Sequence, residues 1–308
     1  MNPLPAAGDQ TKQQIFLKVP QILAVFWIVK LLTTGMGEAF ADYLQFSFRG
    51  SGPSAMGGMS GTTGLIDGIA VLALTAALVL QFRTRRYVAW VYWLAVSMVS
   101  ITGTILADTL QRQLGGPVNA SIIFAAILAV IFAAWYASEK TLSIHSICTK
   151  RREAFYWAVV VVTFTLGTAL GDMTADFLGL GYSGSIVLFA VLFAIPFVAS
   201  RSGVLNSIAA FWFAYVMTRP LGASVADWMD SGSFRGGLGW GTLPVSIGLT
   251  ILIMGFVIYL SVTRVDVAGP VGKTQGPVVS PTSGVPASPL PAPGRQTRRA
   301  RSQGSHRH

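Results

Sequence analysis

Long apolar runs separated by short polar segments dominate the chain. Each run is close to the length of about 20 residues that an α-helix needs to cross roughly 30 Å of hydrocarbon. Eight such runs lie at about residues 20–44, 63–82, 87–110, 117–137, 154–178, 183–200, 204–229 and 241–262. The pattern predicts an all-α polytopic membrane protein with eight transmembrane helices.

One polar motif occurs in these runs four times, in the form W-x9-G-x4-D. Its tryptophans are Trp27, Trp93, Trp157 and Trp212, its glycines are Gly37, Gly103, Gly167 and Gly222, and its aspartates are Asp42, Asp108, Asp172 and Asp227. A regular repeat of this kind sets the architecture of a chain. We therefore predict four tandem helical hairpins, each with a motif helix followed by a plainer second helix, at about residues 20–82, 87–137, 154–200 and 204–262.

Two membrane crossings per hairpin return the chain to its starting side, so all four motif helices are expected to run in the same direction. Parallel repeats of this kind occur among transporters. The predicted transmembrane domain, residues 20–263, follows a polar segment at 1–19 and precedes a tail at 264–308 that is rich in Pro, Gly, Ser and Arg. Such a composition cannot bury a core, so we expect a disordered tail whose arginines are either solvated or in contact with anionic lipid headgroups.

A polar stripe follows one face of each motif helix, because residues four apart in a helix are neighbours. It occupies positions 3, 7, 11 and 15 after the tryptophan and ends in the motif aspartate. A charged side chain at the centre of a bilayer costs at least about 2.5 kcal/mol, so these stripes should face a protein interior or a water-filled cavity. Each motif glycine is followed four residues later by Ala or Gly, a pattern typical of close helix packing. We predict four motif helices packed through their glycines around a shared polar centre, with the second helices outside.

The carboxylates of the stripes are the candidate binding residues: Glu38, Asp42, Asp108, Asp172, Asp176 and Asp227. Two pairs among them are four residues apart on one face, and they repel each other unless a cation, a shared proton or a basic partner lies between them. Lys30 and Arg219 are the expected internal counter-charges. Cation binding and a static salt-bridge lattice therefore both account for the stripes. Carboxylate oxygens favour hard cations such as Mg²⁺ or Mn²⁺, although the sequence names no metal.

Several of these residues also have a structural interpretation. Each motif aspartate lies about 22 Å along the helix from its tryptophan, near a water interface, where it can equally end a helix or bind a ligand. Asp230 is expected to be solvated, and the tryptophans are expected to anchor or pack the helices rather than contact a substrate. Pro220 predicts a kink near Gly222, which would be either a hinge or a packing feature.

Charged residues make up 11% of the chain and hydrophobic residues 52%, unlike a soluble domain with about a quarter charged residues. The net charge is +10, and basic residues gather at one set of helix ends. They are Lys12, Lys18, Arg83, Arg85, Arg86, Lys140, Lys150, Arg151, Arg152, Arg201 and Arg264, against Arg49, Arg112 and Arg235 in the opposite loops. This bias predicts cytoplasmic termini in a bacterial inner membrane and explains the net charge without nucleic acid.

Signals for an enzyme are almost absent from the sequence. It has no P-loop, HExxH or GxSxG motif, and its one cysteine, Cys148, excludes an intrachain disulfide or a CxxC metal site. Its three histidines are too scattered for a convincing metal site. We expect no catalytic residues and no cofactor; a membrane enzyme is a third interpretation, behind a transporter and a scaffold.

Four two-helix W-x9-G-x4-D units resemble a bacterial family of integral membrane proteins built from four tandem copies of a "repeat of unknown function". The segment from Lys18 to Leu44 is especially similar to the first unit, and the resemblance covers about residues 18–262. It implies two transmembrane segments and a characteristic tryptophan per unit, and it implies no activity. The fourth unit departs from the others at Arg219, Pro220 and Ala223, which argues against a strictly fourfold ion cage.

From these patterns we expect a secondary transporter or permease for a small cationic solute or metal ion, with or without proton coupling. The alternative is a non-transporting membrane scaffold or sensor whose charges form a structural lattice. The expected partners are the lipid bilayer and a small cation or proton. The sequence sets neither the substrate, the direction of transport nor the oligomeric state.

Overall fold

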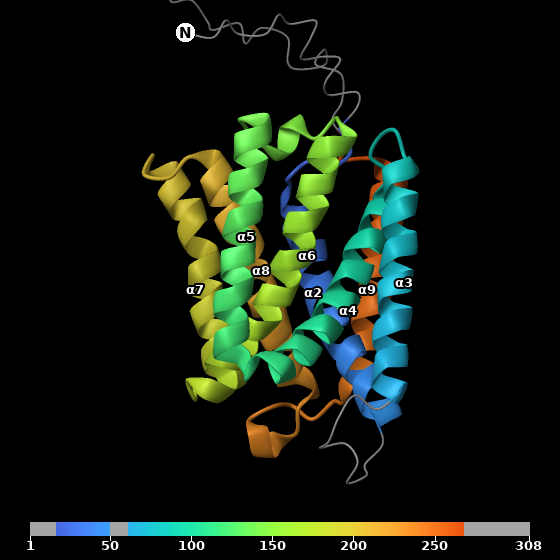
Figure 1. Ribbon diagram of the computed structural model, residues 1–308, viewed down its shortest axis with the longest axis vertical. Coiled ribbons are helices and arrows are strands. Elements are labelled where there is room, and N and C mark those ends of the chain that lie inside the picture. The colour runs from blue at the N-terminus through green and yellow to red at the C-terminus, as the bar shows by residue number, and fades with distance from the viewer. Residues whose placement is uncertain (1–16, 50–60, 268–308) are drawn as a thin grey trace, which may run out of the picture. The chain divides into compact units, whose positions relative to one another are not determined.

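The computed structural model describes residues 17–49 and 61–267. Within these ranges the regular elements are all helices (Figure 1), as the sequence predicts. The eight long helices are α2 (Ala24–Arg49), α3 (Gly61–Arg83), α4 (Ala89–Leu114), α5 (Pro117–Glu139), α6 (Lys150–Asp172), α7 (Gly181–Arg201), α8 (Ser207–Asp230) and α9 (Thr242–Thr263). The prediction of a disordered tail falls almost entirely on residues outside the described ranges.

Seven of these helices are long and apolar enough to cross a membrane. The exception is α8, which has 24 residues and contains Arg219, Asp227 and Asp230. Because α8 packs among the other motif helices, its charged residues are turned toward protein rather than lipid. The fold is therefore that of a polytopic α-helical membrane protein, with α8 inside the bundle.

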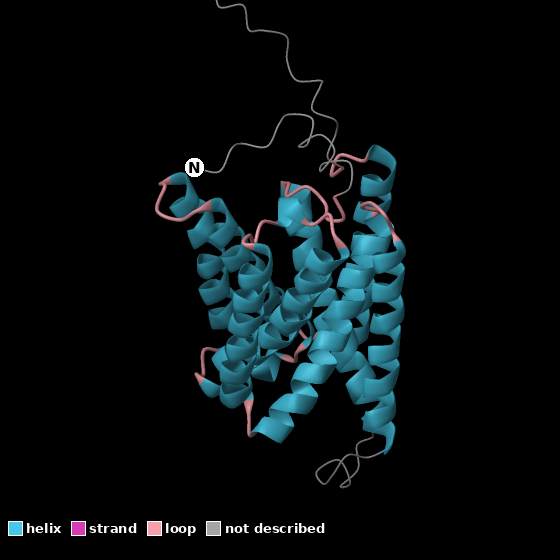
Figure 2. Cartoon of the chain, turned by 45° about the horizontal axis from the view of Figure 1, so that its top comes forward, coloured by secondary structure: helices cyan, strands magenta, loops and turns pink. Residues whose placement is uncertain are grey.

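The helices lie side by side in one bundle (Figure 2), and their burial divides them into an inner and an outer set. The motif helices α2, α4 and α6 have 61%, 72% and 67% of their most apolar stretch buried inside the protein, whereas α3, α5, α7 and α9 have between 17% and 28% buried. In the inner set, α2 contacts α4, α4 contacts α6, α6 contacts α8, and α8 contacts α2 again. The four motif helices thus close into a ring.

Each motif glycine lies where two helices of this ring approach most closely. A Cβ atom added to the glycine would overlap the residue at motif position 7 on the next helix. The four contacts are Gly37 with Ser100, Gly103 with Phe164, Gly167 with Arg219, and Gly222 with Thr34. The same glycine contact therefore recurs around the ring, and the last repeat closes onto the first.

The outer helices interlock the repeats. Each packs mainly against the motif helix of the following repeat rather than its own partner in the hairpin: α3 on α4, α5 on α6, α7 on α8, and α9 on α2. The sequence predicted the outer layer but gave no reason to expect this offset. It means that no hairpin buries its apolar surface alone, as is usual in repeat proteins.

The two ends of the bundle differ in chemistry. We call the end with Arg83, Lys150, Arg201 and Arg264, the upper end in Figure 1, the basic end. The opposite end, where the motif aspartates lie, we call the acidic end. At the basic end Lys18 Nζ lies 2.5 Å from Glu153 Oε2, and Tyr87 donates a hydrogen bond to Asp266. These contacts fasten the described segments before α2 and after α9 to the bundle.

The motif tryptophans also lie toward the basic end. Trp93, Trp157 and Trp212 are buried, and Trp27 is half-buried. They pack with other rings of the inner helices, for example Trp27 with Phe26 and Trp157 with Tyr92. Packing, one of the two roles expected from the sequence, is what the structure shows.

Candidate functional site

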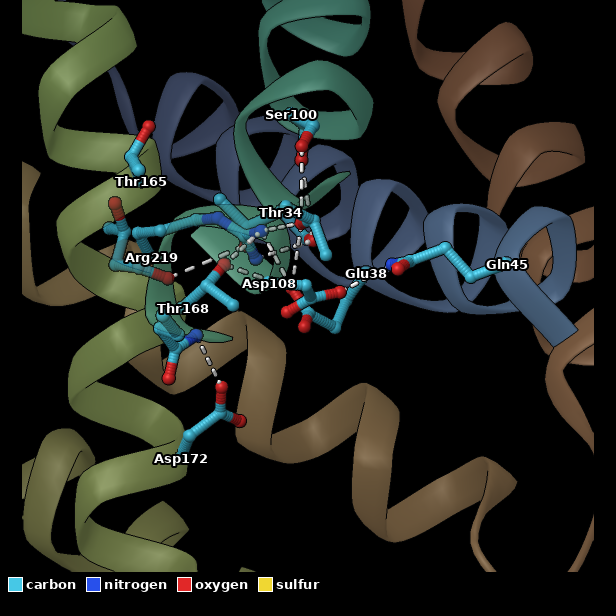
Figure 3. A network of polar contacts seen from close by, with 12 residues as sticks. Thr34, Glu38, Gln45, Ser100, Asp108, Thr165, Thr168, Asp172 and Arg219 are labelled. Carbon is cyan, nitrogen blue, oxygen red and sulfur yellow. Dashed lines mark hydrogen bonds and ion pairs between the residues drawn. The ribbon is translucent and has the colours of Figure 1, made fainter. Parts of the chain in front are cut away.

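Arg219 lies at the centre of the ring and is fully buried. Its position on α8 follows from the fourth repeat, which places arginine where the other repeats have threonine, serine or phenylalanine. Its Nη2 is 2.6 Å from Glu38 Oε2 and also donates to the hydroxyls of Thr104 and Thr168, while Nη1 donates to the Thr34 carbonyl oxygen at 3.2 Å (Figure 3). A guanidinium offers five donors in a fixed fork, which suits such a multiple contact.

Glu38 is the acceptor at the centre of this network. Its Oε2 atom receives hydrogen bonds from Thr104 at 2.9 Å and Thr168 at 3.4 Å in addition to Arg219. Glu38, Thr104 and Thr168 all occupy motif position 11, and the fourth repeat has Ala223 there. Ala223 has no polar side-chain group, and Arg219, one turn earlier on α8, supplies the polar group of the fourth motif helix instead. The network therefore joins one side chain from each of the four motif helices.

Two motif aspartates are held by glutamines of the preceding repeat. Gln45 donates its amide to Asp108, and Gln111 donates to Asp172 at 2.8 Å. Both glutamines occupy motif position 18, three residues after the aspartate of their own helix. An amide donor in this place supplies a hydrogen bond to a carboxylate packed between helices.

The remaining two motif aspartates lie in a different environment. Position 18 is Ala175 in the third repeat and Asp230 in the fourth. Where a glutamine would face Asp42, the ring therefore presents a second carboxylate. Oxygens of Asp42, Asp227 and Asp230 all lie within 4.8 Å of one another. We call these three residues the carboxylate cluster.

The expectation that Asp230 is solvated was wrong. Its side chain is buried, with 8% of the residue exposed, and its Oδ2 atom has no hydrogen-bond partner among the described residues. Asp42 and Asp227 are half-buried. Three carboxylates this close cannot all remain charged without a compensating cation or bound protons. The sequence signal for this cluster is an acid at position 18 where two other repeats have an amide, a position that the motif W-x9-G-x4-D does not include.

Asp176 lies apart from the cluster. It follows Asp172 in a π-helical turn, Met173–Phe177, that ends the third motif helix. Its side chain is 61% exposed and lies 3.6 Å from Arg235 Nη2. The wider turn separates Asp176 from the inner face of the helix, and the predicted pairing of Asp172 with Asp176 is replaced by one partner for each.

Lys30 is buried as expected, but its ammonium group does not lie against a carboxylate. Nζ is 3.7 Å from the ring centre of Tyr215 and 4.6 Å from that of Phe164. It has no hydrogen-bond partner among the described residues. Cation–π contacts of this kind contribute about 2 kcal/mol when desolvated. Of the two predicted counter-charges, only Arg219 forms an ion pair in the described structure.

The polar groups follow the axis of the ring in a fixed order, because each motif position recurs at one level. From the basic end come the tryptophans, then Lys30 over its aromatic rings, then the Arg219–Glu38 network. The carboxylate cluster comes last, four residues beyond Glu38 on α2 or about 6 Å of helix rise. A buried ion pair thus separates the cluster from the basic end.

These features define an integral membrane protein of tandem helical-hairpin repeats with a charged axis. The chain belongs to the family described as "Repeat of Unknown Function (DUF347)", whose repeat matches four times, at residues 25–87, 91–141, 155–201 and 210–266. Comparison with curated proteins and with solved structures gave no match for this chain.

Proposed function

We propose that the protein is a secondary transporter for a small cation and that the carboxylate cluster is its binding site. One observation carries this proposal: the ring closes on Asp42, Asp227 and Asp230 with an acid where two other repeats supply an amide. If the ring had only a structural role, a third glutamine at position 18 would stabilise it more than an aspartate does. The unpartnered Oδ2 of Asp230 supports an additional ligand at this point.

The Arg219–Glu38 network has a different role in this proposal. Its two charges compensate each other, and the hydroxyls of Thr104 and Thr168 hydrogen-bond to both of them, while Arg219 Nε has no hydrogen-bond partner among the described residues. A positive guanidinium across the axis repels a cation that approaches from the cluster. We propose that Arg219 blocks the path of the cation along the axis of the ring. The Arg219–Glu38 ion pair must then break during transport.

The distribution of basic residues predicts the orientation of the protein in the membrane. If the basic end faces the cytoplasm, as the distribution of Lys and Arg predicts, the carboxylate cluster opens toward the opposite side of a bacterial inner membrane. The cluster offers only oxygen ligands, which favour hard cations such as Mg²⁺ or Mn²⁺. Protons compete for the same oxygens, which makes exchange of a cation for protons the simplest coupling.

Binding is testable by thermal unfolding of the purified protein in detergent, with Mg²⁺, Mn²⁺, Ca²⁺ or Na⁺ added at constant ionic strength. A ligand at a hundredfold excess over its Kd stabilises the folded state by about 2.7 kcal/mol. We expect one cation to raise the unfolding temperature of the wild type and the Asp176→Asn control, and to have no effect on Asp42→Asn/Asp230→Asn. An equal rise in that double variant would place the site elsewhere.

The second candidate function is a non-transporting scaffold or sensor. It is favoured by the Arg219–Glu38 network, which joins all four motif helices through buried charges. In this case neutralising the carboxylate cluster would raise stability by removing repulsion, and no cation would change the unfolding temperature of the wild type. The same experiment therefore separates a cation-binding site from a purely structural lattice, and the separation of transport from sensing needs a measurement of flux.

A further inference from the structure

A cavity with several basic lining residues lies at the basic end, far along the helices from the carboxylate cluster. It has a volume of about 600 Å³ and lies between the end of α3 and the start of α6. Four of its lining residues are basic: Lys18, Arg83, Arg85 and Lys150. Val79 and Phe82 form an apolar wall. The cavity thus has one cationic and one apolar side.

Three of the four cations pair with no carboxylate in the part of the chain that the structure describes. Lys18 is bonded to Glu153, but Arg83, Arg85 and Lys150 form no ion pair with any described residue. The basic residues just beyond the cavity differ, since Arg151 and Arg152 both contact Glu139. Arg86, Lys140, Arg201 and Arg264 also form no ion pair with a described residue, but the cavity brings three unpaired cations to one hollow, which suits an anion.

The apolar wall indicates what kind of anion. Val79 is 45% exposed on the outer face of α3, and Leu72, two turns earlier on the same helix, is 70% exposed. Only 22% of this helix's apolar stretch is buried in the protein, so the face that leads into the cavity is a lipid-contacting face. A ligand here has an anionic group at the helix end and a hydrocarbon part along α3.

We propose that this cavity binds an anionic phospholipid. The phosphate headgroup contacts Arg83, Arg85 and Lys150, and an acyl chain lies along Val79 and Phe82. Basic cavities between transmembrane helices are suited to such headgroups, and the apolar wall disfavours a free inorganic anion. The proposal is independent of whether the protein transports a cation.

Cys148 gives a direct probe of occupancy. It lines the cavity, is half-buried, and is the only cysteine in the chain. Burial raises the pKa of its thiol, so it reacts slowly and at a rate that can be followed. A lipid seated in the cavity covers the thiol and slows its alkylation further.

The experiment measures the rate of Cys148 alkylation by an uncharged maleimide in nanodiscs of phosphatidylcholine, with or without a third of phosphatidylglycerol. For the wild type we expect at least a fivefold slower reaction when phosphatidylglycerol is present. In Arg83→Gln/Arg85→Gln/Lys150→Gln the ratio of the two rates should fall close to one. The ratio within each variant is compared because removal of cations itself changes thiol reactivity.

The matched control is Arg201→Gln. Arg201 ends α7 at the basic end as Arg83 ends α3, but it does not line the cavity, so this variant should keep the wild-type ratio. Equal protection in the triple variant and the wild type would overturn the proposal. Equal protection by inorganic phosphate in phosphatidylcholine nanodiscs would overturn the lipid assignment in favour of a soluble anion.

If the triple variant does not fold, the single variant Arg85→Gln tests the same proposal. It should lower the ratio of the two alkylation rates by at least half, and an unchanged ratio would contradict the proposal.

Discussion

Gln45 and Gln111 show what a motif aspartate needs when it is packed within the ring, namely an amide donor from the neighbouring helix. Asp230 occupies the same motif position and supplies an acceptor instead. In the proposed function, this difference between an amide and a carboxylate determines where the ring binds a ligand. Lys30 shows a limit of sequence patterns, since position 3 of the motif does not reveal that its neighbours are the rings of Tyr215 and Phe164.

Arg219 is the residue whose loss should affect stability most. Arg219→Gln leaves Glu38 buried without its counter-charge, and breaking a buried pair in this way costs about 3–5 kcal/mol. The double variant Arg219→Gln/Glu38→Gln should be more stable than the Arg219→Gln variant, because no lone charge remains. Thermal unfolding of the wild type, the two single variants Arg219→Gln and Glu38→Gln, and the double variant measures this coupling. Strictly additive losses would show that the two side chains do not depend on each other.

At the scale of helices, the sequence predicted the four hairpins, the glycine faces and the polar stripes, because all three are set by spacing along one helix. It did not predict what depends on contacts between helices. The offset of each outer helix onto the next repeat is one example. The π-helical turn at Met173–Phe177 is another, and it removes Asp176 from the inner face that a regular helix would give it.

The glycine contacts allow a matched test at this scale. In Gly222→Ala the new methyl group overlaps Thr34 and lies 3.1 Å from the Leu31 carbonyl oxygen, whereas Gly248 on α9 has no atom within 4 Å of the same position. We expect Gly222→Ala to destabilise the protein by about 1–3 kcal/mol through overpacking. Gly248→Ala should leave the unfolding temperature nearly unchanged. Similar effects of the two changes would contradict close packing of α8 on α2.

In the whole molecule, a nearly fourfold ring of motif helices carries charged side chains that differ from one repeat to the next. Three features lie in order along the axis: a buried lysine over aromatic rings, the Arg219–Glu38 network, and the carboxylate cluster. The ion pair sits between the cluster and the basic end, as a closed barrier would. Symmetry supplies the packing, and the fourth repeat supplies Arg219 of the ion pair and Asp230 of the carboxylate cluster.

Cation flux into proteoliposomes tests this account most directly. Purified protein is reconstituted, and uptake of Mn²⁺, Mg²⁺ or Na⁺ is followed with an entrapped indicator, with and without a pH gradient. We expect uptake of one cation above the rate of protein-free liposomes, a loss of at least tenfold in Asp42→Asn/Asp230→Asn, and wild-type rates in Asp176→Asn. Wild-type protein that binds a cation but carries none would contradict transport, and undiminished flux in the double variant would contradict the carboxylate cluster as its site.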